Sequence, residues 1–165
     1  MDAVVVYVDA PLTRTGAATG KVAELVQKSR RFQESLLVIA AGGSVSFPNG
    51  DPIFHNVFSL SKTKAFDLGY YPQGQTRTMS FPKPGIVDVF CHLHPNMSAT
   101  IVVTPTPHFA KPDAEGRFRL EGLSEGEHEL VAWHRAAGFF RKKIRLPLGE
   151  SEGPPRFLLP LRETD

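Results

Sequence analysis

The chain has 165 residues, of which 41% are hydrophobic and 22% charged, so it is long enough to bury a core and has an ordinary globular composition. Its net charge of +2, from dispersed basic residues, gives no reason to expect nucleic acid as a partner. No apolar segment approaches the about 20 residues of a membrane-spanning helix, and the one cysteine excludes an internal disulfide.

The first third of the chain predicts short strands. Residues 3–8 form an apolar, β-branched run typical of a buried strand, and residues 9–20 are rich in Pro, Thr, Gly and Ala and predict a loop. The segment 22–27 fits either a helical turn or a strand. Because the rest of the chain is rich in β patterns, we expect a strand here, then a turn at residues 28–31 and a return through Phe32.

The middle of the chain continues the alternation of strands and turns, with a glycine turn at residues 40–43. Residues 61–76 contain two lysines, one proline and two glycines and predict a long excursion. Asp51 and Asp67 are expected to be turn residues. The predicted strands of this region are 36–39, 44–47, 55–60, 77–81, 86–90 and 98–104.

The segment Thr104–Pro107 reads T-P-T-P and is the best linker candidate, since the sequence pattern changes after it. Beyond it we expect a turn and a strand in 113–120, then further strands in 122–134, 139–146 and 157–159. The whole chain is therefore predicted to be all-β.

The residues from Cys91 to Met97 form the main candidate site. They directly follow the predicted strand 86–90 and contain the one cysteine, His94 three positions later and Met97 three positions after that. Thiolate and thioether ligands favour copper, and a two-histidine, one-cysteine set with a weak axial methionine is an electron-transfer site. A Cys–His–His set also binds zinc, for which methionine adds little.

A second histidine must come from elsewhere, and His55 at the start of a predicted strand is the obvious candidate. His92 lies next to the cysteine. Alternation along Val87, Val89 and Cys91 places His92 on the opposite face of the strand, so we expect it to be solvated or to support the site. A ligand role for His92 stays the alternative, because alternation is unreliable at a strand end.

This order of residues resembles the cupredoxins, in which an early histidine on a strand precedes a Cys-x-x-His-x-x-Met loop. The loop spacing most resembles that of the amicyanins, and the resemblance covers about residues 34–104. It implies a Greek-key β-sandwich that binds one copper ion through His55, Cys91, His94 and Met97. It also implies that Asn56 ties the two ligand loops together.

Two C-terminal patterns resemble the carboxypeptidase regulatory-like modules, which are small transthyretin-like β-sandwiches: D-x-x-G-x-F-x-L from Asp113 and L-x-x-G-x-x-x-L-x-A-W-H from Leu123. We therefore expect a cupredoxin domain at 1–104 and a second module at 105–165. The strand at 3–8 also matches the first strand of such modules and is the alternative partner for the second one. The combination resembles bacterial methylamine-utilisation-like proteins.

We expect a type 1 copper protein that exchanges single electrons with a redox partner protein, and not an enzyme. The alternatives are a copper carrier or sensor without electron transfer, a copper site with an open coordination position that resembles nitrosocyanin, and a structural sandwich with an idle motif. The start of the chain lacks the pattern of a signal peptide. The cupredoxin resemblance nevertheless implies a periplasmic or otherwise extracytoplasmic protein whose leader is absent from this chain.

Overall fold

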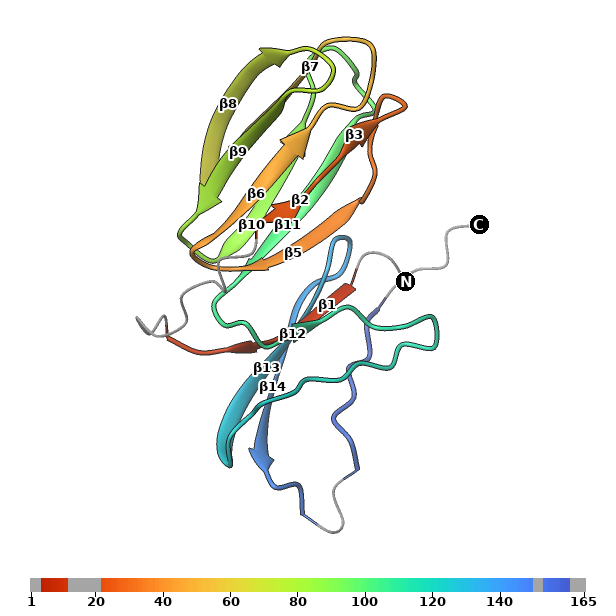
Figure 1. Ribbon diagram of the computed structural model, residues 1–165. Coiled ribbons are helices and arrows are strands. Elements are labelled where there is room, and N and C mark those ends of the chain that lie inside the picture. Colours follow the sequence, from red (N-terminus) through yellow and green to blue (C-terminus); the bar gives the residue numbers. More distant parts are fainter. Residues whose placement is uncertain (1–3, 12–21, 150–152, 161–165) are drawn as a thin grey trace. The chain divides into compact units, whose positions relative to one another are not determined.

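The structure is a computed structural model that describes residues 4–11, 22–149 and 153–160 of the chain. Within these ranges every regular element is a β-strand (Figure 1), so the predicted all-β class is confirmed. The described residues contain no helix long and apolar enough to span a bilayer. Most of the loop expected at 9–20 lies outside the described residues.

The chain folds into two compact units, and one is inserted into the other. The inserted unit is Thr13–Pro107, and the other joins Met1–Leu12 to His108–Asp165. Strand β1 (Val4–Asp9) pairs along its whole length with the C-terminal strand β13 (Gly126–His134). The N-terminal strand therefore belongs to the same sheet as the C-terminal strands. The domain expected at 1–104 does not include this strand, which joins the second unit as the alternative expectation had it.

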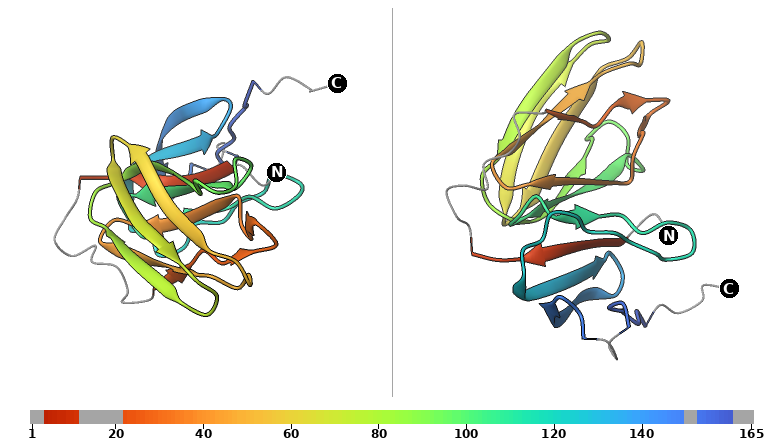
Figure 2. Two further views of the ribbon diagram at one scale, coloured as in Figure 1. Left: turned by 90° about the horizontal axis from the view of Figure 1, so that it is seen from above. Right: turned by 60° about the horizontal axis from the view of Figure 1, so that its bottom comes forward.

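The inserted unit contains two sheets and a small hairpin, whose strands appear from two further sides in Figure 2. The five-stranded sheet has the order β5-β11-β10-β7-β8 and the three-stranded sheet the order β2-β6-β9. Only β5–β11 and β2–β6 pair in parallel among these strands. The strands of the two sheets are β2 (Ala23–Glu24), β5 (Leu36–Ala40), β6 (Gly43–Pro48), β7 (His55–Ser61), β8 (Lys64–Tyr71), β9 (Thr76–Phe81), β10 (Gly85–Phe90) and β11 (Ser98–Thr104).

One hydrophobic core joins the two sheets. Alternate residues point inward, so the core cluster contains Val45 and Phe47 of β6 together with Val87 and Val89 of β10, and all four are inaccessible to solvent. At about 25 cal/mol per Å² of apolar surface, burying each such side chain stabilises the fold by about 1.5–3 kcal/mol. The predicted Greek-key β-sandwich is confirmed for this unit.

The structure confirms one local expectation in this unit and corrects another. The segment after residue 22 forms β2 and then the hairpin of β3 (Gln27–Lys28) and β4 (Arg31–Phe32), with its turn at Ser29 and Arg30. The excursion expected at 61–76 is wrong, because β8 (Lys64–Tyr71) spans half of it. Phe66 and Leu68 of β8 pack against the core, which pulls this segment into the sheet.

The other unit is built on a single four-stranded sheet in the order β12-β1-β13-β14, with β12 at Phe109–Ala110 and β14 at Gly138–Leu146. The turn at Asp113 forms, and its backbone N–H donates to the Arg117 carbonyl at 2.9 Å. The strands expected after that turn and at 157–159 are wrong, since neither segment joins a ladder. The transthyretin-like β-sandwich module expected at 105–165 thus stays a prediction.

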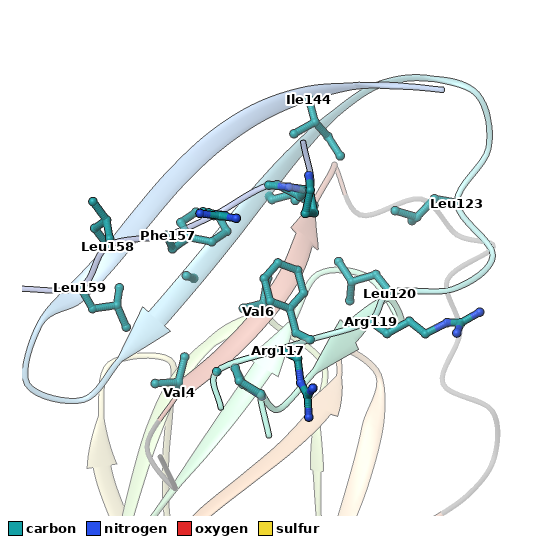
Figure 3. A pocket seen from close by; sticks show the side chains of 18 of the residues that line it. Val4, Val6, Arg117, Arg119, Leu120, Leu123, Ile144, Phe157, Leu158 and Leu159 are labelled. Carbon is teal, nitrogen blue, oxygen red and sulfur yellow. The ribbon is translucent and has the colours of Figure 1, made fainter. Parts of the chain in front are cut away.

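A cavity of about 1010 Å³ lies against one face of this sheet. Figure 3 shows Val4 and Val6 of β1 facing it together with Phe157 and Leu159 from the C-terminal segment. None of the four predicted metal ligands lines it.

Candidate metal centre

Three predicted ligands converge in the inserted unit. The Sγ of Cys91 lies 3.8 Å from His55 Nδ1 and 3.6 Å from His94 Nδ1. The three atoms all lie within 4.8 Å of one another. Two imidazole nitrogens and a thiol that face a common point can hold one metal ion, and this donor set suits copper.

Two neighbouring strands position these side chains. His55 is the first residue of β7, and Cys91 directly follows β10, which pairs with β7 in the same sheet. Because the two strands are antiparallel, the start of β7 and the end of β10 lie at the same end of the sheet, which brings residues distant in sequence together. Both His55 and Cys91 are buried, whereas His94 in the loop after Cys91 is half-buried. Solvent therefore reaches the cluster from the side of His94.

The loop that carries His94 is closed by its own backbone. The N–H of Met97 donates to the His94 carbonyl at 2.9 Å, and the N–H of Cys91 donates to the Met97 carbonyl at 3.2 Å. Met97 is almost fully buried and belongs to the core cluster. The loop is therefore fixed at both ends, and its methionine points into the protein.

Asn56 links the two ligand segments. It follows His55 in β7, is inaccessible to solvent, and its Oδ1 accepts a hydrogen bond of 2.8 Å from the backbone N–H of His92. This is the role that the cupredoxin resemblance implied for Asn56.

His92 lies outside the metal cluster. Its ring stacks on Phe58 with a centroid distance of 3.7 Å and an angle of 7°, and its Nε2 lies 3.6 Å from Asp67 Oδ2. The position agrees with the supporting role expected for His92. Asp67 was expected to be a turn residue, but it lies within β8, where its carboxylate faces the His92 ring.

Asp51 has a larger part than the sequence indicated. It was expected to be a turn residue, yet its Oδ2 lies 2.8 Å from His55 Nε2, and the carboxylate is buried. A ring that donates from Nε2 to this carboxylate leaves the lone pair of Nδ1 directed at Cys91. The only sequence feature that pointed to this contact was an aspartate four residues before a histidine. Aspartate is common in turns, so this spacing alone did not indicate a role at the site.

The charge states of the surrounding groups suit metal binding. Burial lowers the pKa of His94, and the neighbouring His55 acts in the same direction, so the neutral imidazole that a metal needs is favoured. Burial raises the pKa of Asp51, but hydrogen bonds from Arg30, His55 and Ser29 outweigh it and leave the pKa below its usual value. Burial likewise raises the pKa of Tyr71, the pairing partner of His55, to about 12.

The chain matches none of the protein-family models and none of the curated proteins. Among solved structures it is similar to a reduced amicyanin variant, with a TM-score of 0.48 and 20% identity over 59% of this chain and 97% of that chain. It is also similar to a purple cupredoxin from Nitrosopumilus maritimus, with a TM-score of 0.45 and 20% identity over 50% of this chain and 99% of that chain.

A third similar structure is the Cu-containing nitrite reductase (NirK) from Thermus scotoductus SA-01. The TM-score is 0.48 and the identity 22%, over 50% of this chain but only 22% of the reductase. With TM-scores below 0.5 and identities below 25%, these likenesses establish neither a family nor an activity for this chain. What those proteins bind is said of them alone, and copper is a candidate for this chain because of its own two-histidine, one-cysteine donor set.

Proposed function

We propose that this protein binds one copper ion through His55, Cys91 and His94, with Met97 as a weak fourth ligand, and transfers single electrons between redox partner proteins. The observation that carries the proposal is the convergence of two Nδ1 atoms and the Sγ atom within 4.8 Å. When bound, the copper supplies a one-electron couple that no side chain of the cluster offers.

The chain's own residues hold the site in one arrangement. Strands β7 and β10 fix His55 and Cys91, and backbone hydrogen bonds fix the loop of His94. A ligand set that keeps its geometry between oxidation states needs little reorganisation when an electron moves, which favours fast transfer. The half-buried ring of His94 is the ligand through which electrons enter and leave. By the resemblance to cupredoxins, we place this activity outside the cytoplasm.

The test is to load the protein with Cu(II) and record its visible spectrum and voltammogram. We expect an intense thiolate-to-copper charge-transfer band and a reversible one-electron wave. Cys91→Ser should lose the band, and Ser98→Ala, at the exposed first residue of β11, is a matched control that should keep it. A colourless complex would contradict the proposal. A coloured complex with slow, irreversible reduction would favour a carrier or sensor instead.

A further inference from the structure

A continuous chain of hydrogen bonds runs from the β3–β4 hairpin to the candidate ligand His55. The backbone N–H of Ser29 donates to Asp51 Oδ1 at 2.7 Å, and the backbone N–H of Arg30 donates to Oδ2 at 2.8 Å. The same Oδ2 faces His55 Nε2 at 2.8 Å. Both oxygens of a buried carboxylate are thus occupied, and one of them contacts a ligand ring.

The hairpin adopts an uncommon backbone conformation to make these bonds. Ser29 and Arg30 both have positive φ, 56° and 57°, which residues with a side chain seldom adopt. Two successive residues in this conformation turn their N–H groups toward one point and form a site for an anion. Such backbone strain persists where the surrounding contacts demand it, and here the Asp51 carboxylate is the group that both N–H donors reach.

The turn that carries Asp51 is itself held on both sides. The N–H of Gly50 donates to the Gln27 carbonyl of the hairpin at 2.8 Å. The side chain of Asn49 accepts from the Asp51 N–H at 2.9 Å and donates to the carbonyls of Ile53 and Tyr71. The Asp51 carboxylate therefore has little freedom to follow the ring of His55, so the ring must orient to the carboxylate.

We propose that Asp51 is a positioning residue of the metal centre, with two effects. It holds the proton of His55 on Nε2 and so keeps Nδ1 free for the metal. It also places a fixed negative charge behind the ligand, which favours the more highly charged oxidised copper and lowers the reduction potential. This inference rests on the proposed copper site and adds the residue that orients and tunes it.

The experiment compares the midpoint potentials of copper-loaded wild type, Asp51→Asn and Asp67→Asn. Asp51→Asn keeps the size of the side chain but removes its charge. The affinity for copper(I) relative to copper(II) should therefore rise about tenfold, which raises the reduction potential by about 59 mV for one electron. Asp67→Asn is the matched control, because its carboxylate faces His92, which is outside the cluster. It should shift the potential far less.

A second readout needs neither copper nor a variant. Long-range proton–nitrogen NMR of the metal-free wild type should show the His55 ring protonated on Nε2 and with its Nδ1 unprotonated. This measurement tests whether Asp51 holds the proton of His55 on Nε2, even if Asp51→Asn fails to fold. The opposite tautomer would overturn the proposal.

The outcomes separate this inference from the proposed function. If wild type binds copper with its charge-transfer band and Asp51→Asn has an unchanged or lower potential, Asp51 does not tune the site, and the copper proposal stands. If both aspartate variants raise the potential equally, the effect is one of net charge and the positioning role is wrong. If wild type shows no copper band but the Nε2 tautomer of His55 is found, the proposed function fails and the orienting role of Asp51 holds.

Discussion

Met97 is held in place by the backbone of the ligand loop and by the core. Its N–H and its carbonyl both bond within the loop, to His94 and Cys91, and its side chain packs in the core. The fold therefore keeps Met97 in place whether or not a metal is bound. A thioether held in this way can act as a weak ligand that tunes the reduction potential of the metal and contributes little to the affinity.

Met97→Leu should accordingly leave copper bound but raise its potential. Replacing the sulfur with hydrocarbon makes the surroundings more apolar and disfavours the more highly charged oxidised state. We expect a rise of roughly 60–120 mV, equal to one or two tenfold changes in relative affinity. Voltammetry measures the shift, and Met79→Leu on β9, outside the ligand loop, is the control. Loss of the metal in Met97→Leu would contradict this weak role.

Asp67 gives the stability of the protein a dependence on pH. A hydrogen bond from the Gly69 N–H lowers the pKa of Asp67, and although burial opposes it, bonds from Asn56 and His92 help to keep the pKa below its usual value. A depressed carboxyl pKa stabilises the fold above the unfolded value of about 3.9 and loses that effect as the pH falls through the folded value.

Asp67→Asn should therefore unfold at lower urea than wild type at about pH 6, and the difference should shrink below about pH 4. Urea titrations of both proteins at several pH values measure it. Glu24→Gln, a change at an exposed residue, should show little difference at any pH. If the urea midpoints of wild type and Asp67→Asn differ as much in acid as at neutral pH, the ionised carboxylate is not the source of the difference.

At the scale of single residues, the sequence could predict the ligand types but not all of their supports. Cys91, His94 and Met97 are close in sequence and follow a readable strand, so their grouping was accessible. The role of Asp51 was not, because it depends on backbone donors of Ser29 and Arg30, about 20 residues away in a hairpin turn. Only the folded chain brings that turn beneath the aspartate.

Among the elements, β10 begins at a glycine whose backbone lies close to the Thr63 side chain. Gly85 begins this strand with φ +144°, and a Cβ added to it would lie 2.4 Å from Thr63 Oγ1. Six residues later the strand delivers Cys91 to the cluster. The close approach of backbone to Thr63 therefore contributes to the placement of the metal ligand, and only glycine fits both the space and the backbone angle.

Gly85→Ala should lower the free energy of unfolding by about 1–3 kcal/mol, through backbone strain and the clash with Thr63. Urea unfolding measures the loss. Adding Thr63→Ala should recover part of it, because the clash is relieved while the strained φ remains. A double variant no more stable than Gly85→Ala would show that the space beside Thr63 is not limiting.

The sequence predicted strands well where β-branched runs were bounded by turns, as in β1, β10 and β11. It missed β8, whose inward Phe66 and Leu68 alternate with polar residues and glycine and do not form an apolar run. It predicted a strand at 117–120 where the apolar residues Phe118 and Leu120 line a cavity and pair with no neighbour. Alternation shows which side of a segment is apolar, but a strand also needs a partner with free backbone groups.

At the scale of the whole molecule, the inserted unit is self-contained. Its core cluster and all four candidate ligands lie between residues 13 and 107. The change of sequence pattern after the T-P-T-P linker marked the C-terminal limit of this unit. The N-terminal limit could not be fixed in the same way, because the partner of strand β1 lies more than 100 residues away at Gly126–His134.

A fragment of residues 13–107 should therefore fold alone and bind copper with the spectrum of the full chain. A compact unit with its own hydrophobic core needs no further segment for cooperative folding. Circular dichroism and copper titration of the fragment test this, with Cys91→Ser in the same fragment as the control for metal binding. An unfolded fragment, or one with altered colour, would show that the site depends on the surrounding unit.

The most direct test of the copper site is a copper-edge anomalous difference map from crystals of the copper-loaded full chain. We predict one strong peak bounded by the Nδ1 atoms of His55 and His94 and the Sγ atom of Cys91, with the Met97 sulfur facing it. A peak at any other residues, or no peak between these three atoms, would contradict the account.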